Sequence, residues 1–171
     1  MKILCVLGSL QQRSANRALI ELASQRRPAG VDLRPSLSLG DLPHYNADQD
    51  ANEVPSAVAT WRREIEDCDA VFIATPEYGH GMPGTLKNAL DWVTRSGQFM
   101  DKRVAATCAA QGEGRGLLGL ESLSRTLRAI SARVVWEEPI IVSRSSIDNA
   151  GRIQSDEVEQ RLTSLLDRLT E

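Results

Sequence analysis

Short apolar runs alternate with amphipathic segments along this chain, and that alternation limits the folds it can adopt. Residues 3–7 and 70–74 are continuous apolar runs, and the first leads directly into Gly8 and Ser9. Such runs suit strands that helices cover on both faces. Residues 31–34, 103–108 and 134–142 also predict strands, and the segments between the runs have helical spacing. The sequence therefore predicts an α/β fold built on a parallel sheet.

Five helices are expected between and after these strands. The first begins at Ser14, repeats apolar residues at Leu19, Leu22 and Ala23, and stops before Pro28. The others are expected over residues 57–67, 85–92, 116–132 and 156–169. Residues 35–55 are rich in Pro, Asp and Asn and predict a long loop with room for a short helical turn. Loops of that length are often functional.

Length and charge narrow the class of protein. A chain of 171 residues can bury a sizeable core, so a single domain over residues 1–171 is expected. The formal net charge is −3 and the arginines form no stripe, which argues against nucleic-acid binding. No apolar stretch approaches the ~18 residues that span a bilayer. Because residues 1–10 also lack a small-residue cleavage site, a cytoplasmic protein without a membrane partner is expected.

The three cysteines predict no special chemistry. Cys5, Cys68 and Cys108 have no CxxC pairing and no neighbouring His cluster. The pattern therefore indicates neither a zinc site nor a disulfide scaffold. We expect three buried, reduced thiols and no metal site.

The loop after the first strand has the composition of an anion site. Parallel sheets bind ligands at the carboxyl ends of their strands, which makes the loops after the first, third and fourth strands candidates. Residues 8–16 offer Ser9, Ser14 and Asn16 as donors, Arg13 as a cation, and the backbone N–H groups of a helix start. Alternatively, Ser14 only caps the helix and Ser9 lies in an ordinary turn. No P-loop motif is present, which argues against nucleoside triphosphate hydrolysis.

The loop after the third strand is the most specific part of the sequence. Residues 75–92 read TPEYGHGMPGTLKNALDW, and residues 8–16 read GSLQQRSAN. Together they resemble the NAD(P)H-dependent FMN reductase family of flavodoxin-like proteins, whose motifs are PEYNxxxPGxLKNAxDW and GSxRxxSxN. The resemblance extends to LPHYN at residues 42–46 and to the closing strands, and so to most of the chain.

This resemblance implies both a fold and a function. The implied fold is a flavodoxin-like three-layer sandwich with a five-stranded parallel sheet of order 2-1-3-4-5 and helices on both faces. The implied function is hydride transfer from NADPH or NADH to bound FMN and on to a flavin, quinone or other acceptor. Family members are commonly dimers or tetramers, so a homodimer or homotetramer is expected. The expected FMN contacts are Ser9, Gln11, Arg13, Ser14, Asn16, Pro76, Glu77, Tyr78, Gly79, Ala110, Gln111 and Gly112.

No catalytic side chain is implied, because the flavin N5 accepts hydride directly. Glu77 is expected to order its loop rather than act as an acid, and Tyr78 to flank the ring or pack within a dimer. His44 and His80 are expected to be loop residues. On the helix from residue 85, Trp92 is predicted to lie at a subunit contact. It shares one face of the helix with Asn88 and Arg95, whereas Leu86, Leu90 and Val93 line another face that is expected to meet the sheet.

Two departures from the family motifs keep other functions open. Gln11 replaces the motif Arg, which removes one charge-assisted phosphate contact that Arg13 can replace, and Gly79 replaces the motif Asn. The glycine-rich residues 109–116 do not match the Rossmann fingerprint, because Leu117 occupies its third glycine position. The alternatives are a flavodoxin-like electron carrier and a non-enzymatic binding protein that has lost flavin.

Overall fold

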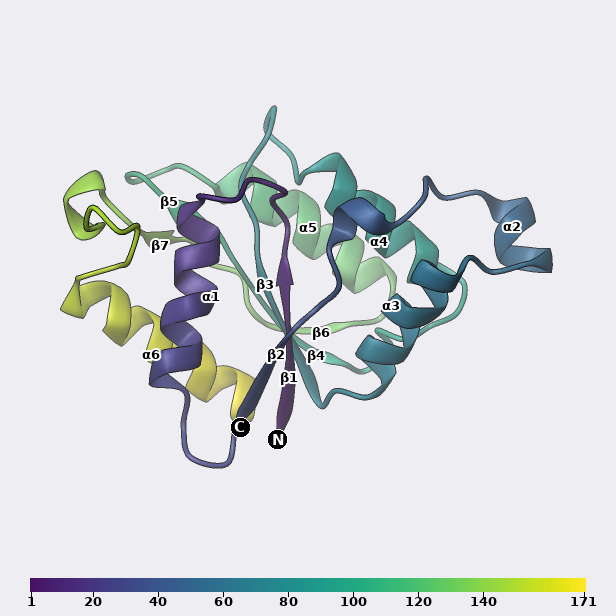
Figure 1. Ribbon diagram of the computed structural model, residues 1–171, viewed down its shortest axis with the longest axis horizontal. Helices are drawn as coiled ribbons and strands as arrows, with labels where there is room; N and C mark the ends of the chain where they lie inside the picture. The colour runs from purple at the N-terminus through teal and green to yellow at the C-terminus, as the bar shows by residue number, and fades with distance from the viewer.

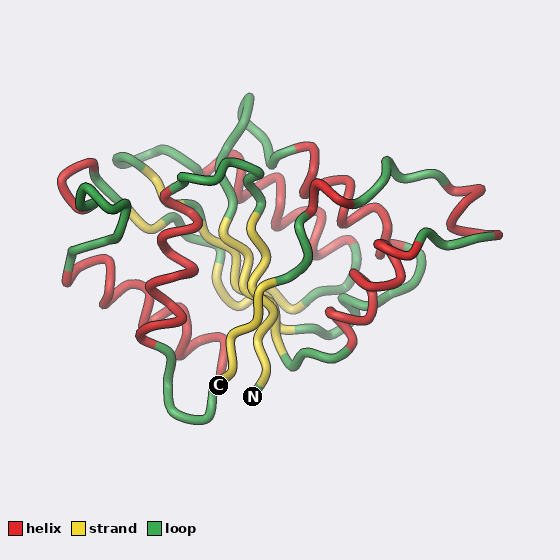
Figure 2. The backbone as a smooth tube through the Cα atoms, in the orientation of Figure 1, coloured by secondary structure: helices red, strands yellow, loops and turns green.

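The computed structural model describes residues 1–171, and its centre is one parallel sheet (Figures 1 and 2). The sheet has the order β2-β1-β3-β4-β6. Counted along the chain, these five strands have the order 2-1-3-4-5, which confirms the predicted flavodoxin-like topology. The strands are β1 (Lys2–Leu7), β2 (Asp32–Pro35), β3 (Ala70–Ala74), β4 (Arg103–Thr107) and β6 (Arg133–Trp136).

The two faces of the sheet follow from the alternation of side chains along each strand. Leu4 and Val6 of β1 belong to one buried cluster, and Ile3 and Cys5 belong to the other. Successive residues of a strand point to opposite faces, so a continuous apolar run supplies both clusters at once. This is why the apolar runs at residues 3–7 and 70–74 form the two central strands.

Helices cover both faces (Figure 1). Helices α1 (Ala15–Arg26) and α6 (Asp156–Thr170) pack on one face, and α3 (Ser56–Glu66), α4 (Gly84–Thr94) and α5 (Leu117–Ala129) pack on the other. Helix α1 ends where Arg27 turns extended, at φ −56° and ψ 142°. The following Pro28 disfavours the helical conformation at Arg27, and the expected stop is confirmed.

The expected long loop contains two short helical segments, η1 (Leu39–Asp41) and α2 (Ala47–Asn52). Helix α4 holds this segment in place. Trp92 Nε1 donates to the Pro43 carbonyl at 2.8 Å, and Asn88 Nδ2 donates to the same oxygen at 2.9 Å. Asn88 Oδ1 also accepts the Tyr45 N–H at 2.8 Å. The segment is therefore ordered by side chains of the family motif.

The prediction for Trp92 was wrong. Its side chain is 0% exposed and belongs to the core between the sheet and the helices, so it has no surface to offer a second subunit. Leu86, Leu90 and Val93 are buried as expected. The helical pattern placed Trp92 on a different face, but the segment around Pro43 covers that face as well.

The last strand is shorter than expected. The run at residues 134–142 divides into β6 and β7 (Ile140–Ile141), and β7 pairs with a short strand β5 (Ala109–Ala110). Pro139 lies in the gap and has no N–H to donate to a ladder. The carbonyl of Glu138 is satisfied by side chains instead, from Thr107 Oγ1 at 2.8 Å and Trp136 Nε1 at 3.0 Å. A 3₁₀ turn, η2 (Arg144–Ser146), follows.

Candidate functional site

The predicted site residues lie in the loops after β1, β3 and β5, except Asn16 in the first turn of α1 and Ala110 at the end of β5, and these loops meet at the carboxyl edge of the sheet (Figure 1). Hydrogen bonds join them in pairs. Gly8 N–H donates to the Ala74 carbonyl at 2.9 Å, and Thr75 N–H donates to the Thr107 carbonyl at 2.9 Å. Asn16 Oδ1 accepts the Ala109 N–H at 2.8 Å. The tertiary structure thus brings together residues that are about a hundred positions apart in the chain.

The loop after β1 leaves a row of backbone donors free. Ser14 Oγ accepts the Arg17 N–H at 3.2 Å as the N-cap of α1, and Ser9 Oγ accepts the Gln11 N–H at 3.1 Å. The capping role that the sequence left open for Ser14 is therefore real. The backbone N–H groups of residues 12–16 make no hydrogen bond within the chain. Together with the helix dipole, they can hold an anion.

Asn16 links the first loop to the third. Asn16 is 5% exposed, and its Oδ1 accepts a hydrogen bond from the Ala109 N–H. Its Nδ2 makes no hydrogen bond within the chain. The amide can therefore still donate to a ligand while its oxygen fixes the neighbouring loop. Gln11 and Arg13 are exposed, with side chains free to turn toward a bound anion.

The loop after β3 is a tight hairpin turn. Tyr78 and Gly81 exchange two backbone hydrogen bonds, of 2.9 and 3.0 Å. The two residues between them are left-handed, with φ 55° at Gly79 and φ 63° at His80. Positive φ at both central positions is typical of a type I′ turn, in which Gly and Asn are favoured. Replacement of the family Asn by Gly79 therefore keeps the conformation that the turn requires.

The hairpin also decides which main-chain groups can meet a ligand. Tyr78 uses both its N–H and its carbonyl within the turn, and Pro76 has no N–H. The N–H groups of Gly79 and His80 remain free. The Tyr78 side chain is 55% exposed at the same edge. A ligand beside this turn therefore meets Gly79 through the main chain and Tyr78 through its ring.

Glu77 connects the turn to helix α5. Its Oε2 accepts the Gly119 N–H at 2.9 Å, in the first turn of α5, and its Oε1 lies 3.5 Å from His80 Nδ1. A carboxylate at a helix N-terminus is stabilised by unpaired N–H groups and by the helix dipole. The expected loop-ordering role of Glu77 matches this geometry. Gly119, its partner, was missed because a glycine inside a helical pattern has no local signal for such a contact.

The third loop is held mainly by its ends. Ala110 is 3% exposed, and its carbonyl accepts the Val142 N–H at 2.7 Å. Gln111 and Gly112 follow with free N–H groups, and Gln111 is exposed.

Cys108, just before β5, is a buried free thiol. Burial raises the pKa of Cys108 to about 11, more than the Glu77 backbone N–H lowers it, so this thiol is protonated near neutral pH.

Two cavities lie beside this site rather than between its three loops. The larger, about 730 Å³, includes Ser9 but none of the other predicted contacts. The second, about 380 Å³, is lined by Arg13 and Ser14 together with residues 147–151.

His44 and His80 are exposed loop residues. No cluster of His, Cys, Asp and Glu is placed to hold a metal ion, and no helix is long and apolar enough to cross a membrane.

Comparison with known proteins assigns the family. A model described as NADPH-dependent FMN reductase matches residues 1–145. The chain belongs to this family. A relative from Burkholderia named 2-hydroxy-1,4-benzoquinone reductase is 32% identical over 98% of the chain and 93% of the relative. An NAD(P)H-dependent FMN reductase from Pseudomonas aeruginosa is 30% identical over 99% of the chain and 93% of the relative.

Solved structures of a flavoenzyme oxidoreductase and of a flavodoxin share the fold. The flavoenzyme NAD(P)H:(acceptor) oxidoreductase from Paracoccus denitrificans superposes with a TM-score of 0.84 at 24% identity, over 99% of this chain and 97% of that one. Flavodoxin 1 from Bacillus cereus superposes with a TM-score of 0.65 at 14% identity, over 99% and 97% of the two chains. The flavodoxin-like fold predicted from the sequence is confirmed.

Proposed function

We propose that this FMN reductase relative binds FMN across its three loops and oxidises NADPH or NADH, with a quinone or flavin as acceptor. The observation that carries the proposal is the row of free N–H groups at residues 12–16, beside the free amide of Asn16. These donors fit a phosphate monoester. When bound, FMN would supply the hydride and electron transfer that no side chain of the protein supplies.

The phosphate end would be held by the first loop. The hydroxyls of Ser9 and Ser14 accept hydrogen bonds from the backbone, which leaves their own protons free to be donated. Asn16 Nδ2 adds an amide donor. Gln11 and Arg13 are exposed, and Arg13 supplies the positive charge that the family arginine would bring at position 11.

The ring end would be held by the other two loops. We assign flavin contacts to Pro76, Glu77, Tyr78 and Gly79 in the hairpin turn, and to Ala110, Gln111 and Gly112 in the third loop. Free N–H groups at Gly79, Gln111 and Gly112 support this assignment, because the pyrimidine edge of a flavin needs main-chain donors. For Glu77, the contact with Gly119 indicates that its contribution is to position the turn.

Relatives support the choice of acceptor. Proteins similar to this chain are named quinone reductase and FMN reductase. The exposed ring of Tyr78 offers a flat apolar surface to such a planar molecule.

We also propose that residues 1–171 work as one domain in the cytoplasm. Because Leu10, Tyr78, Leu117 and Leu118 are large, exposed apolar residues, we further propose a homodimer or homotetramer.

The proposed activity is tested by titrating flavin-free protein with FMN and then following NADPH and NADH oxidation with a benzoquinone. Micromolar or tighter fluorescence quenching and acceptor-dependent nicotinamide oxidation are expected. FMN binding without nicotinamide oxidation would instead indicate an electron carrier. Absence of FMN binding at saturating concentration would indicate a protein that has lost flavin.

The position of the phosphate is tested by Gln11→Arg, which restores the family residue. We expect FMN to bind about tenfold more tightly, because a charge-assisted hydrogen bond to phosphate is added. Gln12→Arg is the matched control, since Gln12 is also exposed and adds the same charge one residue away. Equal tightening in both variants would show a general charge effect and would contradict the assigned phosphate position.

A further inference from the structure

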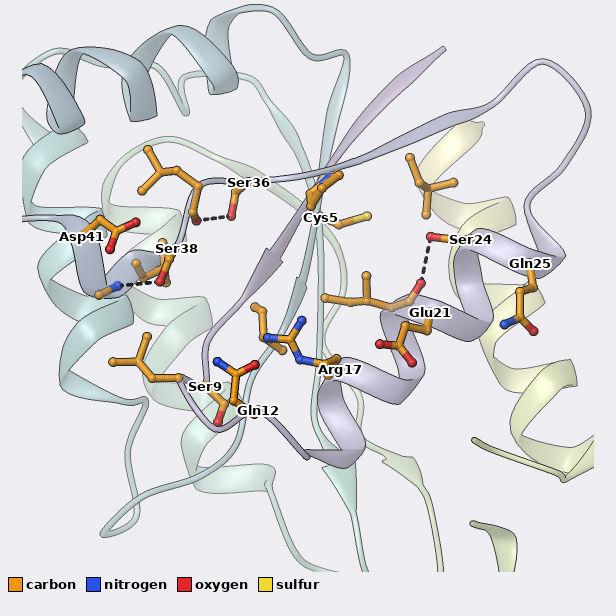
Figure 3. A pocket seen from close by; sticks show the side chains of 18 residues that line it. Cys5, Ser9, Gln12, Arg17, Glu21, Ser24, Gln25, Ser36, Ser38 and Asp41 are labelled. Atoms are coloured by element: carbon orange, nitrogen blue, oxygen red, sulfur yellow. Dashed lines mark hydrogen bonds between the residues drawn. The ribbon is translucent and has the colours of Figure 1, made fainter. Parts of the chain in front are cut away.

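One cavity of the protein lies largely outside the proposed flavin contacts. It lies between α1, β1 and the segment that leads from β2 to η1, and we call it the edge groove (Figure 3). Its volume of about 730 Å³ is in the range of small-molecule sites. Ser9, at its end, is the one predicted FMN contact that lines it.

The groove exists because β2 is short. Pairing between β1 and β2 ends at Cys5 and Pro35, with a last hydrogen bond from Ser36 N–H to the Cys5 carbonyl at 2.9 Å. The chain then leaves the sheet toward η1. The end of β1 at Leu7 therefore has no neighbour on this side, and the space beside it remains open.

Arg17 supplies an unpaired cation to this space. Its guanidinium extends from α1 into the groove (Figure 3). Its Nε is buried and has no hydrogen-bond partner. None of the ion pairs in the structure involves Arg17, although Glu21 is one helical turn away. A buried donor without a partner is unfavourable, so the site favours an oxygen anion from outside the chain.

Apolar side chains form one part of the lining, and Ser24, Ser36 and Ser38 are among the polar residues beside them. Leu7, Ile20, Leu33 and Leu37 line the groove, and the floor includes Cys5, which is 3% exposed. Burial raises the pKa of the Cys5 thiol to about 12, as expected where water has little access. A ligand that satisfies Arg17 would therefore place an apolar body against these walls.

Two carboxylates limit the charge of the ligand. Glu21 and Asp41 also line the groove and are exposed. They would repel a polyphosphate, whose several charges cannot all pair with Arg17, more strongly than a single negative charge held at Arg17. The groove is therefore suited to one anionic group rather than to a nucleotide.

We propose that the edge groove binds a monoanionic amphiphile, with its carboxylate on Arg17 and its alkyl or aryl body on the apolar walls. The proposal does not depend on FMN binding, since Arg17 and the apolar wall residues are not among the proposed flavin contacts.

Calorimetric titration of the protein, with and without saturating FMN, with decanoate and with 2-naphthoate tests this. Saturable one-site binding of at least one acid is expected, and the stronger binder identifies an alkyl or an aryl body. Decanol and 2-naphthol, which lack the charge, should bind about tenfold more weakly or worse. Binding of neither acid, equal binding of the neutral analogues, or release of FMN by the acid would overturn the proposal.

Variants locate the site. Arg17→Gln should weaken acid binding by about tenfold or more, whereas Arg125→Gln removes the same charge from an exposed pair on α5 and should leave binding unchanged. Ser24→Trp places a large side chain from α1 into the groove and should abolish acid binding. This variant tests the site if the Arg17→Gln protein is unstable. Glu21→Gln should tighten binding. Retained binding in a folded Arg17→Gln or Ser24→Trp protein would overturn the proposal.

Discussion

At the scale of single residues, the contact between Glu77 and Gly119 connects the hairpin turn to α5. A side chain added at Gly119 would place its Cβ 3.0 Å from Glu77 Cβ and 3.1 Å from Glu77 Cα. Only glycine lets the helix approach the turn this closely. The geometry of the turn therefore depends on a residue 42 positions away, through the hydrogen bond from Gly119 N–H to Glu77.

Gly119→Ala is expected to destabilise the protein by about 1 kcal/mol. The gain of about 0.5–1 kcal/mol in helix propensity is smaller than the cost of about 1–3 kcal/mol for overpacking. Gly84→Ala is the matched control, since Gly84 is also helical and a Cβ there meets nothing within 4 Å. Urea unfolding measures both. If the Gly119→Ala protein is as stable as the Gly84→Ala protein, the turn moves to accommodate the added Cβ at little cost in free energy, which would contradict the prediction.

At the scale of elements, one arginine joins α2, α3 and α4. Arg62 Nε donates to the Trp92 carbonyl at 3.1 Å, and its Nη2 pairs with Asp50. The side chains are 14% and 3% exposed, and Asp50 Oδ2 is buried without a partner. Buried charges are tolerated only where they are paired. This pair therefore holds the segment between β2 and α3 against α4.

Removing Arg62 should cost more than removing Asp50. Arg62→Ala leaves the Asp50 carboxylate buried and unpaired, a loss of about 3–5 kcal/mol for such pairs. Asp50→Ala leaves Arg62 bonded to Trp92 and should cost less. Arg63→Ala, at an exposed neighbour on the same helix, should change stability by no more than about 0.5 kcal/mol. The three unfolding free energies check this order, and hydrogen exchange in α2 should accelerate in the first two variants. Equal losses at Arg62 and Arg63 would contradict it.

At the scale of the whole molecule, ionisable groups set the pH range of the fold. The Arg128 hydrogen bond lowers the pKa of Glu137, the Arg152 N–H lowers that of Asp148, and Arg26 lowers that of Glu159. Burial acts in the opposite direction on Glu64, whose pKa it raises. Burial also raises the pKa of Cys5 to about 12 and that of Cys108 to about 11.

Stability is therefore expected to fall at both ends of the pH scale. The carboxylates whose pKa is lowered stabilise the fold at a pH above the pKa that they have in the unfolded chain. This stability is lost as the pH falls below about 4. The buried thiols of Cys5 and Cys108 stabilise the fold at a pH below the pKa that they have in the unfolded chain. This stability is lost from about pH 9 upward. Thermal unfolding across pH checks both limbs. Asp148→Asn should flatten the acid limb and Cys5→Ala the alkaline limb, and unchanged limbs would contradict these assignments.

Much of the fold followed from local patterns. The runs at residues 3–7 and 70–74 predicted the two central strands because burial on both faces requires continuous apolar sequence. The motif at residues 75–92 identified the family and located the turn at Gly79, since turn conformation depends on neighbouring residues. What the sequence by itself determined is therefore the order of the elements, the family, and the loops that carry the proposed site.

Only the tertiary structure decided contacts between residues distant in the chain. It buried Trp92 under the segment around Pro43, and it ended β6 before Pro139, where side chains satisfy the interrupted backbone. It also gave Glu77 its partner in α5 and left Arg17 unpaired in the edge groove. Helical and strand periodicity describe each element alone, whereas burial and hydrogen-bond partners depend on how the elements pack.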